Sequence, residues 1–449
     1  MAQYLSTQYA EANVHPIGLD DPIYPPNEVA VARNITKYQP RSINNNNTAS
    51  VTVCNLSGQI EFQFNTSNMQ WLDLYNSYFL TRYTLPTAGP PVYGTIQHLT
   101  QNLIGQAYLY INGVQVAFTN AWSVASKVNK RLQFSKQYNE SIHEINYRSD
   151  ATVAGSVILE AAYGLNAGSA PLPALLLGTG GIFTDKENLD GFFLRDKHSC
   201  WIPPNSEVRI VLIVDPGAFP KSTRCDHAAI PTATILINSI EFVASSLIRN
   251  IPGPIGEWVL KLVTNSITTS AAGADCNRQL TVNPNIMKTA IVFQESTATT
   301  NALVVDKTAC GDVLSYLTQN EKTDHSRTVT GVAGAAQLNT LQLQLGSIVN
   351  PPQAYDFATF LHREAYEQYM QLTGKSKSNE SQESFLDWLT EPIYLFDFPR
   401  PDEDKSTNLI IRATRTAGGT PQMHIVEMDL TVVSMKFDSQ GAVVETTVN

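Results

Sequence analysis

Alternation of polar and apolar residues is the dominant pattern along this chain. Residues 59–64 (QIEFQF) alternate without a break, which places Ile60, Phe62 and Phe64 on one buried face of a strand. Residues 341–345 (LQLQL) repeat the pattern in the second half of the chain. We therefore expect a protein built mainly from antiparallel β-strands.

Two long stretches share one plan. Residues 201–215 give a proline-marked loop and a β-branched strand, and residues 234–244 give a long alternating strand after a gap. The same order recurs from residue 398 to residue 437. Repetition on this scale predicts two β-domains of similar design. In the last strand the apolar positions change phase at Val433, which predicts a β-bulge there.

Turn and helix signals interrupt the strands. Asn112-Gly113 between two apolar runs predicts a tight hairpin, because its turn needs positive φ at both positions. A helix is expected over residues 122–138, with Ala121, Ala125, Val128 and Leu132 forming an apolar stripe. A second helix is expected over residues 353–372, after a Pro-Pro pair and before Gly374.

The expected organisation has five parts. They are an N-terminal arm (1–48), a first jelly roll (49–245), a linker (246–256), a second jelly roll (257–440) and a C-terminal tail (441–449).

Two long insertions are expected within the rolls, at residues 140–193 and 296–335, where they form outer towers or fill gaps between subunits. Residues 161–184 carry no charge, but their prolines and glycines favour a long surface loop over a membrane helix.

Composition adds a limit on partners. Charged residues make up 16% of the 449 positions, below the usual ~25%. A weakly charged surface suits a protein covered by neighbouring subunits, although a β-rich composition alone also lowers the charge. The net charge of −10 argues against direct or sequence-specific nucleic-acid binding. The densest basic cluster, residues 127–131, is expected to be the solvated face of a helix.

The N-terminus lacks the layout of a signal peptide, so we expect synthesis in the host cytosol. The five cysteines are odd in number and widely spaced, and they predict no disulfide framework.

The search for reactive groups yields few candidates. Lys375 lies in a Gly-Lys-Ser triplet, but Tyr369 stands where a phosphate loop needs glycine. The glycines of residues 178–181 lack the strand-to-helix context of a dinucleotide site. Residues 402–404 (DED) could hold a hard cation, and a solvated turn is the simpler interpretation. We expect no catalytic or cofactor-binding residues, and hence no enzyme.

Two short pairs deserve separate mention as metal-ligand candidates. His198 and Cys200 form one pair, and Cys225 and His227 form the other. At strand period each pair projects to one side, which would supply two nitrogens and two sulfurs for tetrahedral zinc. The one-residue spacers differ from the usual spacing of cysteine pairs, so the simpler expectation is buried or incidental residues and no metal.

In their order along the chain, several segments resemble the double jelly-roll major capsid proteins of Polinton-like viruses, virophages and adintoviruses, distant relatives of adenovirus hexon. In that family an aromatic-rich segment after the Asn-Gly hairpin leads into a helix near a Leu-Leu pair. Here Trp122, Val128, Leu132 and Phe134 occupy the corresponding positions, although the family's Tyr-x-Tyr and Leu-Leu are not kept. The resemblance covers residues 55–245 well and residues 280–437 mainly by architecture. Its segments are residues 60–80 with Trp-Leu-Asp-Leu, residues 110–113, the helix from Trp122, residues 194–214 with Pro203 and Pro204, and the strand ending Ile240-Glu-Phe242.

This resemblance implies an all-β fold of two tandem eight-stranded jelly rolls with a few short helices in the loops. It also implies a homotrimer that forms a pseudo-hexameric capsomer of an icosahedral double-stranded DNA virus shell. The implied partners are neighbouring capsomers, penton and minor capsid or cement proteins, and, in virions that contain one, an inner membrane beneath the shell. The implied location is the virion.

Three other classes stay open. A secreted or surface tandem β-sandwich that binds carbohydrate would also be weakly charged, and it would carry an exposed aromatic platform. A cupin-type enzyme would need a histidine-rich metal triad, whereas the eight histidines are scattered. A penton-type minor capsid protein would need only one jelly roll.

Overall fold

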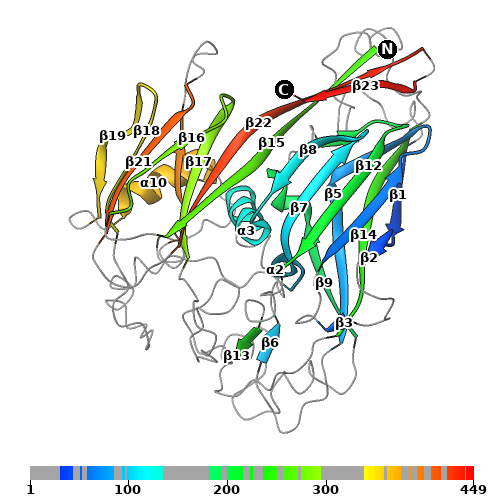
Figure 1. The fold of residues 1–449 in the computed structure, drawn as a ribbon, viewed down its shortest axis with the longest axis horizontal. Helices are drawn as coiled ribbons and strands as arrows, with labels where there is room; N and C mark the ends of the chain where they lie inside the picture. Colours follow the sequence, from blue (N-terminus) through cyan, green and yellow to red (C-terminus); the bar gives the residue numbers. More distant parts are fainter. Residues whose placement is uncertain are drawn as a thin grey trace.

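Two pairs of facing β-sheets lie side by side in the computed structural model (Figure 1). Sheet pairing is antiparallel throughout the ladders of the described residues. The structure describes residues 31–43, 51–52, 58–84, 94–96, 99–134, 182–194, 200–215, 223–225, 236–249, 256–271, 275–294, 338–357, 362–375, 385, 388, 392–398, 406–415, 422–439 and 441–448.

The first pair of sheets encloses an aromatic core. One sheet has the order β1-β14-β5-β11, with β3 on β14 and β9 on β5, and the facing sheet has the order β2-β4-β12-β7-β8. Phe62 on β4 lies 6.0 Å from Phe79 on β5 and 6.1 Å from Phe242 on β14, between ring centres. The strands are β1 (Val31–Tyr38), β2 (Ser42–Ile43), β3 (Val51–Thr52), β4 (Gln59–Asn65), β5 (Gln70–Thr84), β7 (Ile104–Ile111), β8 (Val114–Thr119), β9 (Ile182–Asn188), β11 (Trp201–Ile202), β12 (Glu207–Val214) and β14 (Leu236–Arg249).

The second pair repeats this design. One sheet has the order β10-β15-β22-β17-β20, with β23 on β22, and the other has the order β16-β21-β18-β19. Tyr355 on β19 lies 6.2 Å from Phe396 on β20, across the core. The strands are β10 (Phe193–Leu194), β15 (Gly256–Ala271), β16 (Arg278–Thr281), β17 (Ile286–Gln294), β18 (Leu338–Leu345), β19 (Ile348–Asp356), β20 (Tyr394–Asp397), β21 (Asn408–Arg415), β22 (Gln422–Phe437) and β23 (Val443–Val448).

The expected double jelly roll is thus confirmed as an architecture. The alternating segments at residues 59–64 and 341–345 are strands whose apolar residues are buried. Asn112 and Gly113 have φ of 51° and 80°, as the predicted hairpin requires. Eight strands were expected in each roll. Among the described residues, the two sheets of the first roll hold six and five strands, and those of the second hold six and four.

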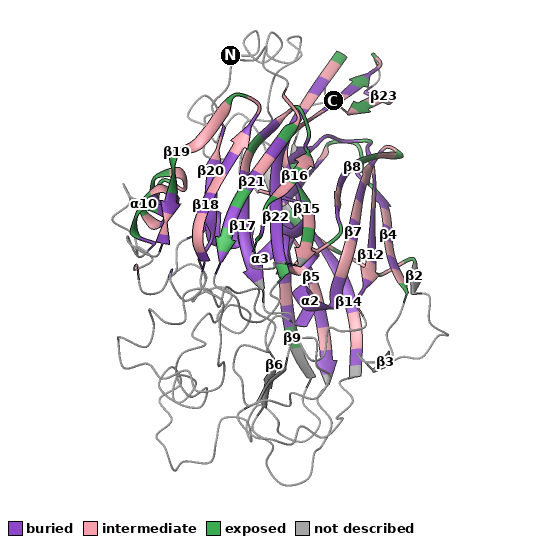
Figure 2. Ribbon diagram, turned by 60° about the vertical axis from the view of Figure 1, so that its left-hand side comes forward, coloured by how far each residue is buried: buried purple, intermediate pink, exposed green. Residues whose placement is uncertain are grey.

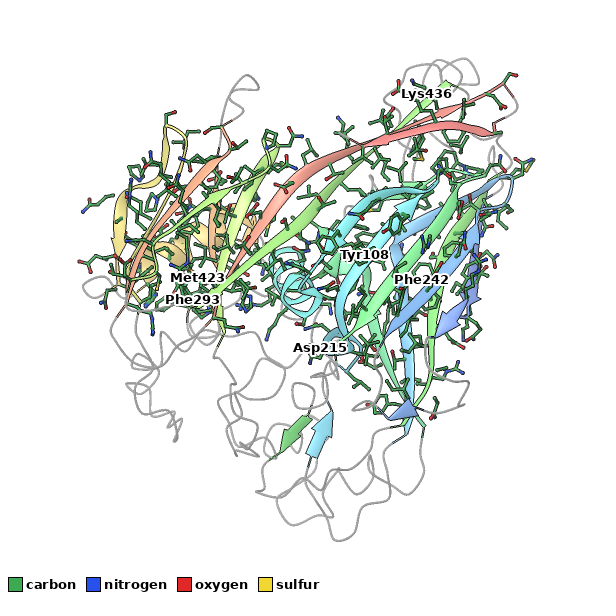
Figure 3. The ribbon with its side chains drawn as sticks, in the orientation of Figure 1. Tyr108, Asp215, Phe242, Phe293, Met423 and Lys436 are labelled. Atoms are coloured by element: carbon green, nitrogen blue, oxygen red, sulfur yellow. The ribbon has the colours of Figure 1, made fainter. Side chains whose placement is uncertain are left out.

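Two long strands belong to both rolls. The ladder between β15 and β22 runs without a shift from Gly256↔Phe437 to Ala271↔Gln422. One end of β22 contributes Val433 and Met435 to the first core, and the other contributes Met423 and Ile425 to the second core. Met423 and Lys436, near opposite ends of β22, show how far this strand reaches (Figure 3).

The predicted bulge at Val433 is wrong. Because the ladder with β15 is continuous, no residue is inserted there. All seven positions from Met423 to Asp429 are buried, whereas Val433, Met435 and Phe437 alternate with more exposed neighbours (Figure 2). The change of phase therefore marks the passage of one strand from the second core to the first.

Helix α3 (Trp122–Gln133) ends five residues earlier than predicted, because Phe134 at its C-terminus is extended. Its stripe of Ala125, Val128 and Leu132 packs into the second core. The prediction that residues 127–131 form a solvated face is wrong. Lys127, Lys130 and Arg131 are all buried, since α3 lies enclosed between the two rolls (Figure 1).

Several strands lie across the expected boundaries. Within the expected arm, β1 pairs with β14 and β2 pairs with β4 in the first pair of sheets. Strand β14 continues through Arg249, four residues into the expected linker. Residues 182–194, at the end of an expected insertion, form β9, a short 3₁₀ turn (Leu189–Gly191) and β10. The expected tail contains β23, which pairs with β22. The rest of the arm and of both insertions lies outside the described residues.

The start of the second predicted helix is also wrong. Residues 353–356 belong to β19, and α10 (Arg363–Leu372) begins ten residues later than predicted. Strand β19 is the edge of its sheet, where Pro351 and Pro352 are tolerated although they donate no hydrogen bond. The helix ends near Gly374, which has a positive φ of 73° as expected.

Candidate functional site

A buried ion pair joins α3 to β9 between the rolls. Lys130 Nζ lies 2.6 Å from Glu187 Oε2, and each side chain is 1% exposed. Trp122 and Ser126 both donate to Glu187 Oε1, while Gln101 on α2 (Leu99–Leu103) accepts from Lys130. Burial raises the pKa of Glu187, and Lys130 counteracts that shift. With its hydrogen bonds satisfied inside the fold, the pair serves to hold α3 in place.

The contact between α3 and the 3₁₀ turn depends on a glycine. A Cβ added at Gly191 would come within 2.3 Å of the Trp122 ring. The ring also packs edge-on against Phe192, with centres 4.9 Å apart. Only glycine leaves room for the indole here.

The zinc candidates are described only in part. Cys200 is fully buried in the first core, and its carbonyl oxygen accepts from the backbone of Leu74. Cys225 lies on β13 (Thr223–Cys225), paired with β6 (Gly94–Ile96), and its side chain is not described. His198 and His227 lie outside the described residues. The expectation that these four residues bind no metal therefore stays a prediction. Within the described part of the chain, no three His, Cys, Asp or Glu residues are grouped to hold a metal ion.

Lys375 has a structural role. Its Nζ donates to the carbonyl oxygen of Arg131 and to the hydroxyl of Tyr369, which tie the end of α10 to the end of α3. Residues 178–181 and 402–404 lie outside the described residues, as does all of 161–184 except residues 182–184. No helix among the described residues is long and apolar enough to cross a membrane.

An aromatic patch lies on the outer face of the first roll. Tyr108 and Tyr110 alternate along β7 with buried Leu109 and Ile111, so they point away from the core. Phe118 on β8 lies 4.8 Å from Tyr108, between ring centres, and the Arg209 guanidinium lies over Tyr110. We call Tyr108, Tyr110 and Phe118 the aromatic patch. Each of them is half-buried in the single chain.

An open polar hollow of about 540 Å³ lies where β23 meets the first roll. Asn112 accepts from the backbone of Glu207 and donates to Thr446 on β23. Asn205 donates to the carbonyl oxygen of Gly441. Both asparagines have positive φ, a conformation that asparagine adopts more readily than most residues. The two amides therefore fasten the C-terminal strand to the first roll.

Sequence reasoning missed a pair of acids on β22. Glu427 and Asp429 are each 5% exposed, two positions apart on a strand, and so they share a face. Burial first, and the Asp429 charge second, raise the pKa of Glu427 to about 7. Two acids within an otherwise apolar, alternating strand were a signal that could have identified them.

No protein-family model and no curated protein matches this sequence. Solved structures do. The PBCV-1 virus capsid is 10% identical with a TM-score of 0.52, and the match covers 93% of this chain and 98% of that one. The Faustovirus major capsid protein is 8% identical over 93% and 92% of the two chains, with a TM-score of 0.47. The mavirus major capsid protein is 11% identical over 98% and 96%, with a TM-score of 0.45. At such identities the likeness concerns the fold, and it rests on the first of these structures. The chain has the double jelly-roll fold of viral major capsid proteins.

Proposed function

We propose that this chain is a major capsid protein whose homotrimers form pseudo-hexameric capsomers of an icosahedral double-stranded DNA virus shell. The observation that carries the proposal is the pair of jelly rolls held side by side by β15 and β22, in a fold that the PBCV-1 capsid structure shares over almost all of both chains. A trimer of such chains presents six rolls, which is the number that a hexagonal tile needs.

The described residues support a structural role over a catalytic one. The buried Lys130–Glu187 pair, Lys375 and Cys200 are engaged in the packing of the fold. We therefore propose that the chain acts by assembly and is not an enzyme.

The proposed partners are neighbouring capsomers and the penton and minor capsid or cement proteins of the same virion, with an inner membrane beneath the shell in some virions of this kind. The proposed site of synthesis is the host cytosol, and the proposed final location is the virion. No sequence-specific contact with nucleic acid is proposed, in line with the net charge of −10.

Light scattering coupled to size-exclusion chromatography tests the proposal. Three chains of 49.4 kDa give a trimer of about 148 kDa. A stable trimer that assembles into sheets or shells at higher concentration is the expected result. A protein that stays monomeric at all concentrations would contradict the proposal.

The aromatic patch favours one alternative, a carbohydrate-binding β-sandwich. Its tyrosines lie beside polar groups, including Arg209 paired with Glu61. If a sugar ring stacks on Tyr108, the protein should bind glycans on a glycan array, and Tyr108→Ala should abolish this binding. If the chain is a capsid protein instead, the same substitution should weaken the trimer or the contacts between trimers and leave glycan binding absent.

A further inference from the structure

The buried acids of β22 lie at the junction of the two cores. On the face of β22 that carries them, Met423 and Ile425 belong to the second core, and Val433 and Met435 belong to the first. Glu427 and Asp429 occupy the interval between these two apolar sets. The Glu427 carboxylate is almost buried, poorly solvated and repelled by the Asp429 charge, so the charge of Glu427 needs compensation.

The neighbouring strands provide no positive charge on this face. Cross-strand partners share a face of a sheet, and they are Ser266 and Thr289 for Glu427, and Thr264 and Ile286 for Asp429. By the same register, Lys288 and His424 belong to the opposite face. Among the described residues, the Asp429 charge is the one electrostatic influence on Glu427, and no hydrogen bond or ion pair reaches the Glu427 carboxylate.

A third oxygen lies beside the acids. Thr289 is fully buried, and its Oγ1 has no hydrogen-bond partner among the described residues. Because Thr289 pairs directly with Glu427, its hydroxyl is on the same side of the sheet as the carboxylate. A buried hydroxyl without a partner is costly, and such a group indicates a missing ligand. On the other side of Glu427, Ser266 is exposed, which leaves a route from solvent.

We propose that Glu427, Asp429 and Thr289 form a binding site for a divalent cation at the junction of the two rolls. The three ligands supply oxygen atoms only, which is the chemistry of a hard ion such as Ca²⁺, and water completes its six to eight positions. The ion would thereby stabilise the part of β22 that both cores share. This proposal does not depend on the capsid function.

The test uses the full-length protein, stripped of metal with a chelator and dialysed. Calorimetric titration with Ca²⁺ alone should give one ion per chain, and calcium should raise the melting temperature. Glu427→Gln and Asp429→Asn should each abolish both effects. Thr289→Val, which keeps the shape of threonine, should weaken calcium binding while the protein still folds.

Glu367→Gln is the matched control, because Glu367 is 55% exposed and pairs with Arg363 on α10, remote in sequence from β22. This variant should bind calcium as the wild type does. Calcium binding that persists in the double variant Glu427→Gln/Asp429→Asn would place the ion elsewhere and overturn the proposal. A second result would also overturn the proposal: calcium has no effect on the wild type, and Glu427→Gln melts at a higher temperature than the wild type at pH 8. In that case a proton on Glu427, and not a metal ion, would be the compensating charge.

Light scattering on the same samples separates the two proposals. Trimers that bind no calcium would count against the cation site alone. Calcium-binding monomers would count against the capsid function alone.

Discussion

Individual buried side chains in this molecule are paired with residues far away in the sequence. Lys130 and Glu187 are 57 residues apart and meet between the rolls. The spacing of apolar residues correctly predicted which side of α3 enters a core. It could not predict that the basic side is buried too, because the carboxylate that neutralises Lys130 comes from a distant strand.

Removing one partner of this pair should be strongly destabilising. Lys130→Met leaves the Glu187 charge buried without compensation, which costs about 3–5 kcal/mol. Lys130→Met/Glu187→Leu should recover most of that loss, since both charges are then gone. Urea unfolding measures both variants. Arg363→Met, which breaks an exposed pair, is the control and should change little. Equal losses in the single and double variants would contradict this account.

His362 should make the protein sensitive to acid. Its ring stacks on Phe357, with centres 4.1 Å apart, and burial lowers its pKa from 6.5 to about 3. Between these values the unfolded chain binds a proton that the folded chain does not, so stability falls as the pH falls. The urea midpoint of His362→Asn should depend less on pH across this window, since asparagine tolerates the positive φ of 60°. An unchanged pH dependence would show that other groups control acid unfolding.

At the level of strands and helices, the spacing of apolar residues and the turn residues were sufficient to predict those strands that bury one face in one core. Strand β4 and the hairpin at Asn112 follow their patterns. Prediction failed where tertiary context decides. Residues 353–356 follow a Pro-Pro pair, where a helix was expected to begin, but they lie in an edge strand. The phase change at Val433 reflects a strand that crosses from one core to another. The acids on β22 were visible in the sequence, but their burial was not.

The attachment of β23 should depend on the Asn112 amide. Asn112→Gly keeps the positive φ of the turn and loses the bonds to Glu207 and Thr446, each worth about 1 kcal/mol. Hydrogen exchange of residues 443–448 should therefore become faster. Gln115→Ala, on the exposed side of the same hairpin, should leave the exchange unchanged. Protection of β23 in Asn112→Gly equal to that of the wild type would show that the ladder with β22 is sufficient.

For the whole molecule, a charged fraction of 16% indicates that association depends on neutral surface. Exposed ion pairs contribute only ~0–1 kcal/mol each and are screened by salt, whereas apolar burial is worth ~25 cal/mol per Å². The proposed trimer should therefore persist at about one molar salt, where the screening length is ~3 Å. Light scattering across a salt series measures this. Trimers that dissociate as salt is added would show that ion pairs dominate the interface.

The two rolls should also unfold together. The first core includes Trp258 and Leu260 from β15 and Val433 and Met435 from β22, so it is incomplete without the second half of the chain. Calorimetry should show one transition, and a fragment of residues 1–249 should not fold alone. Two well-separated transitions would indicate that each core is stable by itself.

The continuous β15–β22 ladder has a consequence for large assemblies. With 16 paired positions and ~3.4 Å per residue, it acts as a beam about 50 Å long that passes through both rolls. Such a beam has no hinge at its middle, so the angle between the rolls is fixed when the chain folds. A closed shell made of these chains would therefore have to obtain its curvature at the seams between flat, stiff tiles, and shells of different radius could be built from the same unbent part.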